Sequence, residues 1–186
     1  MPAIIAGKRK GAKLQVPEGI GVRPTLARVR EALFSMLTSA CGSLEGKIVL
    51  DPFAGAGLLG LEAWSRGAAH VDLVEMSRPH IQVLRKNIQS LRAPCTEVEV
   101  MAGSSPNDWG RVLSRRYDLV LCDPPYAAGL MPQTLDALVS GEWLRPDAVV
   151  SVELNARDSL ELPECWELVR ERKYGICKIL LLRKTR

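Results

Sequence analysis

Short apolar segments alternate with amphipathic segments along most of the chain, from about residue 47 to residue 153. Short apolar runs bounded by Gly, Pro or Asp predict strands, and apolar positions spaced three and four residues apart predict helices. The strands are expected at 47–51, 70–75, 97–101, 117–122 and 148–153, and the helices near 57–66, 78–92, 106–115 and 131–140. This alternation predicts an α/β fold with a parallel sheet covered by helices on both faces.

The N-terminal part of the chain follows a different pattern. Segments 3–7 and 12–16 predict a small β-hairpin whose turn, residues 8–11, is basic. A helix is expected over 26–39, with Thr25 as its N-cap, because a threonine hydroxyl can accept a hydrogen bond from the first N–H groups of a helix. These elements predict an extension that precedes the alternating pattern.

The C-terminal part also departs from the alternation. Segments 166–172 and 176–183 are both strand-like, no helical pattern separates them, and Tyr174-Gly175 supplies a turn. A mostly parallel sheet completed by an antiparallel hairpin is typical of the Rossmann-like, seven-stranded fold of S-adenosylmethionine-dependent methyltransferases. We therefore expect a single domain over 1–186, with a basic N-terminal extension (1–42) and a catalytic core (43–186).

Composition is that of an ordinary folded protein. A chain of 186 residues can bury one core, and 47% hydrophobic against 25% charged residues is typical of a soluble domain. No segment approaches the ~20 apolar residues of a membrane span, and the N-terminus lacks the apolar run of a secretory signal, so a cytoplasmic location is expected. No spare apolar face is evident, which favours a monomer. With five scattered cysteines and two histidines, neither a disulfide framework nor a metal site is expected.

The excess of positive charge is concentrated at the N-terminus. Residues 1–30 carry seven basic side chains and one acidic side chain, whereas the remaining 156 residues carry 18 basic and 20 acidic ones. A local basic patch suits a phosphate-backbone partner, although a solvated basic tail has the same composition. The candidates for contacts to such a backbone are Lys8, Arg9, Lys10, Lys13, Arg23, Arg28 and Arg30.

A glycine-rich loop follows the first strand of the alternating pattern. Its sequence over 55–60 fits the Gly-x-Gly-x-x-Gly pattern of dinucleotide-binding proteins, and Glu75 ends the next strand, as a ribose-binding acid would. A nicotinamide-dependent oxidoreductase is therefore one interpretation. Asp51 argues against it, because a carboxylate at the end of the first strand would repel a pyrophosphate on the following helix. The same carboxylate would suit the ammonium group of S-adenosylmethionine.

The S-adenosylmethionine interpretation gives each part of the loop a role. Gly55 and Gly57 would let the backbone approach the methionine part of the donor, and Asp51 would help to hold that part. Phe53, which lies between Asp51 and Gly55, completes the predicted binding residues of this loop.

The next two strand ends are expected to bind the remainder of the donor. Glu75 would accept hydrogen bonds from the ribose hydroxyls, and Met76 would pack against the adenine. The adenine amine is expected to contact a backbone group or a hydroxyl after the third strand, where Gly103 and Ser104 are the candidates. Asp108 is the alternative contact.

A second motif, Asp123-Pro124-Pro125-Tyr126, follows the apolar strand at 117–122. An exocyclic amine on a nucleobase is a poor nucleophile because its lone pair is delocalised into the ring. The Asp123 carboxylate and the Pro124 carbonyl can accept its two hydrogens and orient the lone pair toward a methyl group. Pro125 makes the turn rigid, and Tyr126 would stack on a base that has left its helix or loop.

Other chemistry at this motif is disfavoured. Methylation of cytosine C5 would need a cysteine nucleophile, but Cys95 precedes the third strand, and Cys122 would point to the side of its strand opposite Asp123. His70 and His80 are expected in a turn and on a helix surface.

The sequence resembles the bacterial RsmD family, the small-subunit ribosomal RNA guanine-N2 methyltransferases, over nearly its whole length. The matching segments are Ile4–Gly7, Arg23–Thr25, Arg28–Glu31, Asp51–Gly57, Leu61–Ala63, Asp123–Tyr126 and Gly141–Leu144. DNA adenine and cytosine amino-methyltransferases share the Asp-Pro-Pro-Tyr motif. The Arg-Pro-Thr block at residues 23–25 is the feature that favours the RsmD family over these enzymes.

The resemblance implies transfer of one methyl group from S-adenosylmethionine to a guanine N2 in 16S ribosomal RNA, which is guanine 966 in the family. It implies an assembled or partly assembled 30S subunit as the substrate, with Asp123–Tyr126 holding the target base. The N-terminal strands and residues 23–30 would lie near the RNA. Methylation of adenine N6 or of a cytosine amine in DNA or another RNA is the alternative.

Overall fold

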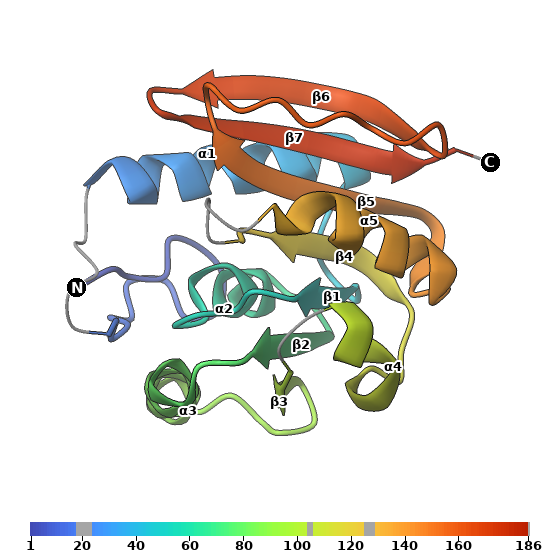
Figure 1. The fold of residues 1–186 in the computed structure, drawn as a ribbon. Coiled ribbons are helices and arrows are strands. Elements are labelled where there is room, and N and C mark those ends of the chain that lie inside the picture. Colours follow the sequence, from blue (N-terminus) through green and yellow to red (C-terminus); the bar gives the residue numbers. More distant parts are fainter. Residues whose placement is uncertain (18–23, 104–105, 125–128, 186) are drawn as a thin grey trace.

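The computed structural model describes residues 1–17, 24–103, 106–124 and 129–185. Seven strands form one sheet in the order β3-β2-β1-β4-β5-β7-β6 (Figure 1). The strands are β1 (Ile48–Asp51), β2 (His70–Glu75), β3 (Val98–Ala102), β4 (Tyr117–Cys122), β5 (Leu144–Asn155), β6 (Trp166–Tyr174) and β7 (Cys177–Lys184). The helices are α1 (Pro24–Cys41), α2 (Leu58–Ser65), α3 (Arg78–Leu91), the 3-10 helix η1 (Pro106–Asp108), α4 (Trp109–Val112) and α5 (Leu130–Ser140).

Strands β1 to β5 are parallel to one another, whereas β7 runs antiparallel to both β5 and β6. The predicted parallel sheet with a C-terminal antiparallel hairpin is therefore confirmed. In a parallel sheet all the carboxyl ends lie at one edge, so the segments after β1, β2, β3 and β4 meet there. This edge carries the residues that the sequence singles out.

Two hydrophobic cores lie on the two faces of the sheet. Neighbouring residues of β1 serve different cores: Val49 packs in the one formed with α1, α2 and α3, and Leu50 packs in the one formed with α4 and α5. Both side chains are fully buried, which explains why the strand reads as a continuous apolar run rather than an alternation. Figure 1 shows α4 and α5 in front of the sheet and α1 behind it.

The N-terminal hairpin is less regular than predicted. Ala3 and Lys13 form an isolated antiparallel bridge, and the Ile4 N–H donates to the Ala12 carbonyl at 2.9 Å. The N–H groups of Ile5 and Ala6 instead donate to the carboxylate of Glu62, at 2.7 and 3.0 Å. Because these donors turn toward α2, the two segments do not form a continuous ladder.

Glu62 is the centre of this contact between the N-terminal segment and the core. Its carboxylate is fully buried, accepts a hydrogen bond from Arg66 Nε at 2.7 Å, and lies 3.8 Å from Arg30 Nε. Arg30 also donates to the carbonyl of Ala3. The predicted role of Arg30 in contacting a phosphate backbone is therefore wrong, since its side chain is 5% exposed and is used inside the protein.

The helix expected at 106–115 is also shorter than predicted. It consists of η1 and the single turn of α4, after which Leu113 adopts an extended conformation. Arg115 then forms ion pairs with Glu99 at 3.2 Å and with Asp72 at 3.4 Å. These contacts hold the segment after the helix against β2 and β3.

Within the described ranges, no helix has the length and apolar character that crossing a membrane requires.

Candidate active site

Four carboxylates lie at the carboxyl edge of four neighbouring strands. Glu75 ends β2, Asp51 ends β1, Asp123 follows β4, and Glu153 lies near the end of β5. Their order along the edge follows the strand order β2-β1-β4-β5. Each neighbouring pair is close enough to interact electrostatically, since Glu75 acts on Asp51, and both Asp51 and Glu153 act on Asp123. The edge therefore concentrates negative charge where parallel sheets bind ligands.

Asp51 is a buried carboxylate, and one of its two oxygens lacks a hydrogen-bond donor among the described residues. Its Oδ2 accepts a hydrogen bond from the Gly60 N–H at 3.0 Å, which ties the end of β1 to α2. Its Oδ1 has no hydrogen-bond partner among the described residues. Burial raises the pKa of Asp51 to about 7, and the charge of Glu75 adds to the shift, although hydrogen bonds from Gly60 and Phe53 oppose it.

This shift predicts a pH dependence of stability without added ligand. The pKa in the fold is about 7 and the ordinary value is 3.8, so ionisation of Asp51 destabilises the folded state. The free energy of unfolding should fall as pH rises between these two values and level off above them. In Asp51→Asn this dependence should be weaker, as urea denaturation across the range would show. Equal slopes in Asp51→Asn, the wild type and an Asp136→Asn surface control would contradict the assignment.

The two predicted loop glycines, Gly55 and Gly57, differ in how much space surrounds the position that a Cβ atom would occupy. A Cβ on Gly57 would lie 2.4 Å from Leu84 Cδ1, and its φ of 84° is unfavourable for other residues, so packing against α3 requires glycine there. A Cβ on Gly55 would meet nothing closer than the Phe53 carbonyl at 4.0 Å. The backbone at Gly55 is therefore the part of the loop that a ligand can approach.

Glu75 positions this loop as well as facing the ligand edge. Its two carboxylate oxygens accept hydrogen bonds from the N–H groups of Gly55 and Ser77, both at 2.7 Å. Met76, which follows it, is 66% exposed, so a large apolar side chain stands in solvent beside the carboxylate. The Gly103 N–H donates to the Glu75 carbonyl at 3.2 Å, which places the start of the segment after β3 next to the end of β2.

Asp123 and Pro124 follow β4 at the centre of the same edge. The Asp123 residue is exposed, yet desolvation by the surrounding protein raises the pKa of its carboxyl well above the ordinary value, and the charges of Glu153 and Asp51 add to this effect. Pro124 is buried and, with Glu153 and Met131, lines a cavity of ≈ 430 Å³. A carboxylate that strongly accepts hydrogen bonds thus lies next to a cavity large enough for a planar ring.

Several predicted residues lie outside the described ranges, namely Arg23, Ser104, Pro125 and Tyr126.

Cys122 lies directly before Asp123 and is fully buried, and burial strongly raises the pKa of its thiol. A thiol that stays protonated is a poor nucleophile, which agrees with the expectation that Cys122 takes no part in covalent chemistry.

Comparison with known proteins identifies relatives over almost the full length of the chain. A family model described as "Conserved hypothetical protein 95" matches residues 3–183. Ribosomal RNA small subunit methyltransferase D of Haemophilus influenzae is 37% identical over 174 residues, covering 93% of this chain and 89% of the relative. The Escherichia coli K12 protein of the same name is 38% identical over 173 residues, covering 92% and 84%.

The chain belongs to the RsmD family.

Solved structures of putative methyltransferases are similar to this chain over nearly its whole length. The putative methyltransferase yhhF of E. coli superposes with a TM-score of 0.84 and 34% identity, covering 98% of this chain and 97% of that one. A putative methylase of H. influenzae gives a TM-score of 0.81 and 34% identity, covering 99% and 98%. The predicted Rossmann-like methyltransferase fold is therefore confirmed.

The basic residues expected near RNA in an RsmD-family protein are in different environments. Lys10, Lys13 and Arg28 are exposed, and Arg9 is partly buried. Lys8 is held by the protein, since its Nζ lies 2.8 Å from Glu97 and 4.1 Å from the centre of the Trp64 ring. These five residues stay predictions.

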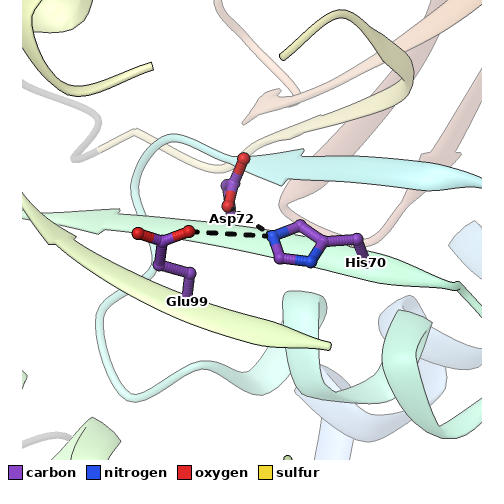
Figure 2. A group of neighbouring side chains, drawn as sticks. All are labelled: His70, Asp72 and Glu99. Atoms are coloured by element: carbon purple, nitrogen blue, oxygen red, sulfur yellow. Dashed lines mark hydrogen bonds and ion pairs between the residues drawn. The ribbon is translucent and has the colours of Figure 1, made fainter. Parts of the chain in front are cut away.

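A polar cluster lies toward the amino ends of β2 and β3, away from Glu75. Figure 2 shows His70, Asp72 and Glu99 pointing toward one another, with His70 Nε2 at 2.8 Å from Asp72 and 4.0 Å from Glu99. Such a trio can bind a metal ion, but the guanidinium of Arg115 contacts both carboxylates and supplies the positive charge.

The cluster extends from the buried His70 and Asp72 to the exposed Glu99. The Tyr117 hydroxyl donates to Asp72 at 2.7 Å, and burial together with the charge of Asp72 raises the pKa of Tyr117. His70, which was expected in a turn, is instead the buried first residue of β2, and its Nδ1 lies 2.9 Å from the Thr96 carbonyl. The cluster joins β2, β3 and β4 at the end of the sheet opposite the candidate site.

Glu153 was not among the predicted site residues. The pattern of β5 marks it as one polar position within a strand, which is common in many folds. Only the strand order, with β5 beside β4, places Glu153 next to Asp123.

Proposed function

We propose that this chain transfers a methyl group from S-adenosylmethionine to the N2 amine of a guanine in 16S ribosomal RNA within the 30S subunit. The observation that carries the proposal is the position of Asp123-Pro124 directly beside the Asp51 strand end, with the Glu75 strand end next along the same edge. An amine-holding turn and a glycine loop suited to a methyl donor thus share one edge. The relatives' name, Ribosomal RNA small subunit methyltransferase D, supports ribosomal RNA as the substrate.

The residues around the loop fit S-adenosylmethionine. The buried Asp51 Oδ1 is an acceptor for which the described chain supplies no donor, and the ammonium group of the methionine part is a suitable one. Gly55 leaves the loop open on its outer side, Glu75 would accept from the ribose hydroxyls, and exposed Met76 gives the adenine an apolar surface. A pyrophosphate fits less well, because Asp51 and Glu75 would repel it.

When bound, S-adenosylmethionine supplies an electrophilic methyl group. The Asp123 carboxylate and the Pro124 carbonyl would accept the two hydrogens of the amine and orient its lone pair. As the nitrogen gains the methyl carbon, it must lose one proton. The raised pKa of Asp123 makes its carboxylate a stronger acceptor for that proton than an ordinary aspartate.

Glu153 should therefore tune the pH dependence of the reaction. Its charge raises the pKa of Asp123, and catalysis requires the ionised form, so turnover should decline on the acid side of the profile. In Glu153→Gln the neighbouring charge is lost, and this decline should move to lower pH. The matched control is Glu161→Gln, because Glu161 lines the same cavity but is not among the charges that act on Asp123. Identical pH profiles for Glu153→Gln and wild type would contradict this role.

The proposed function is tested by a methyl-transfer assay with labelled S-adenosylmethionine. Unmodified 30S subunits, naked 16S ribosomal RNA and duplex DNA are offered in parallel, and the product nucleoside is identified by mass spectrometry. N2-methylguanosine from the ribosomal substrates would support the proposal, and comparing 30S subunits with naked RNA would define the substrate form. Methylated adenine or cytosine from DNA, or no transfer with tight NAD binding in calorimetry, would overturn it.

A further inference from the structure

A basic groove lies between α1 and β6, outside the candidate active site. It has a volume of ≈ 510 Å³. Its lining carries three arginines and, among its described residues, one acidic side chain, so the groove has a net positive charge. The residues that matter here are Arg28, Glu31 and Ser35 of α1 and Arg170, Arg172 and Tyr174 of β6.

A β-bulge explains why β6 presents these side chains to α1. Leu168 lies opposite Leu182, whose side chain packs in the core with α4 and α5. The register then shifts between Leu168 and Arg170, and Arg170 lies opposite Leu181, whose side chain packs in the core with α1. A bulge inserts one residue and so reverses which face the following residues occupy. Without it, Arg170 would point to the other face of the sheet.

After the bulge the alternation of the strand is regular. Arg172 lies opposite Ile179 and Tyr174 opposite Cys177, and both partners belong to the core with α1. The Tyr174 hydroxyl lies 3.9 Å from Met36 Sδ of α1, which places the end of β6 against this helix. Two arginines spaced by one residue thus form one wall of the groove.

The other wall, on α1, has a stripe of small side chains between Glu31 and Met36. Ser35 and Ser39 of α1 are exposed, and Ala32 is partly buried, so no long side chain of this stripe fills the groove. Arg28, in the first turns of α1, adds a third guanidinium. Together, the walls leave room for an extended chain between guanidinium groups.

The arginines of the groove are not neutralised by the protein. Arg28, Arg170 and Arg172 are exposed and form no ion pair within the described part of the chain. By contrast, Arg115 and Arg116 elsewhere on the surface each pair with a glutamate. Arg172 Nη1 donates to the Glu171 carbonyl at 3.1 Å, but no carboxylate of the described residues neutralises its charge. Such guanidinium groups are well suited to phosphate, which they bind through two parallel hydrogen bonds.

The groove begins at the edge that carries the candidate active site. Cys177, just past the β6–β7 turn, lies opposite Asn155 at the end of β5, two residues beyond Glu153. Figure 1 shows the start of α1 and the β6–β7 turn on the same side of the molecule as the ends of β1, β2 and β4. A nucleic-acid strand with one base at Asp123 can therefore continue past the turn into the groove.

We propose that the groove between α1 and β6 binds the phosphate backbone of the substrate RNA away from the target nucleotide, with Arg170 and Arg172 as the main contacts. This inference rests on the proposed function for the identity of the nucleic acid. The groove offers exposed charge rather than pockets for bases, so it contributes affinity and orientation, not sequence specificity.

The test is the salt dependence of binding to a 16S ribosomal RNA transcript. The double variant Arg170→Gln/Arg172→Gln is compared with Lys173→Gln/Lys184→Gln, which removes two charges of the same hairpin on its other face, opposite Lys178 and Trp166. Loss of two phosphate contacts should weaken binding about tenfold and reduce the slope of log affinity against log salt by about 1.5. Arg28→Gln/Arg170→Gln, which changes both walls, should behave in the same way.

The possible outcomes distinguish a failure of the groove inference from a failure of the proposed function. A wild-type salt slope in both groove variants, or an equal loss in Lys173→Gln/Lys184→Gln, would overturn the inference. Methyl transfer to 30S subunits is followed in parallel with the wild type. A wild-type chain that binds the transcript with the expected slope and groove dependence but transfers no methyl group would overturn the proposed function and leave the groove assignment standing.

Discussion

Asp123→Ala is expected to reduce methyl transfer by about a hundredfold to ten-thousandfold, with little change in S-adenosylmethionine affinity. The variant removes the carboxylate that would hold one amine hydrogen and accept the released proton. The residues proposed to bind the donor (Asp51, Gly55 and Glu75) lie on other strand ends and keep their own hydrogen bonds. Single-turnover rates with saturating donor, together with calorimetric titration of the donor, measure the two effects separately.

Two further variants make this result specific. Asp123→Asn keeps an oxygen that can accept a hydrogen bond but cannot take up a proton at neutral pH, so its rate should lie between those of Asp123→Ala and wild type. Asp136→Ala removes an exposed aspartate of α5 and should leave the rate unchanged. If Asp123→Ala retained full activity, the proposed mechanism would be wrong.

Glu62→Ala is expected to lower the free energy of unfolding by about 3–5 kcal/mol. Glu62 is fully buried and accepts hydrogen bonds from the backbone of Ile5 and Ala6 and from Arg66. Its removal would leave the buried guanidinium of Arg30 without the carboxylate 3.8 Å away. Burial already lowers the pKa of Arg30, which shows that its charge is poorly solvated. Urea denaturation followed by circular dichroism provides the measurement.

The matched control for this prediction is Glu164→Ala. Glu164 is exposed, so its replacement should change the free energy of unfolding by less than about 0.5 kcal/mol. Glu62→Gln keeps the acceptor oxygen but loses the charge and should fall between the two. A loss below about 1 kcal/mol in Glu62→Ala would show that the N-terminal segment is held mainly by its apolar side chains, Ile4 and Leu14.

The core of the fold could be predicted from local pattern because the central strands are short and carry closely spaced apolar residues. β2 and β4 begin and end where the sequence placed them, at 70–75 and 117–122. Both are almost wholly buried, and the residues that follow them, Met76 and Asp123, are exposed. The glycine loop and the motif at Asp123 could be found for a related reason, since ligand sites of parallel sheets follow strand ends in the sequence.

Features that depend on distant residues could not be predicted in this way. Glu62 looks like an ordinary polar position of a helix, and Arg30 looks like part of a basic patch, until the fold brings them together across 32 positions of sequence. The bulge in β6 leaves no glycine or proline as a signal, yet it decides which face Arg170 occupies. Glu153 likewise gains significance only from the neighbouring strand.

The position of Glu62 on α2 has a consequence for the spacing between the glycine loop and the N-terminal segment. α2 begins directly after the loop at Gly57, and its last turns hold the N-terminal segment through Glu62 and Ser65. Eight helical residues span about 12 Å. The length of this helix therefore fixes the distance between the loop and the segment that carries Lys8 to Lys13. One inserted residue would turn Glu62 by about 100° and lose the alignment. The length of α2 is thereby constrained by geometry at both of its ends, independently of its apolar packing.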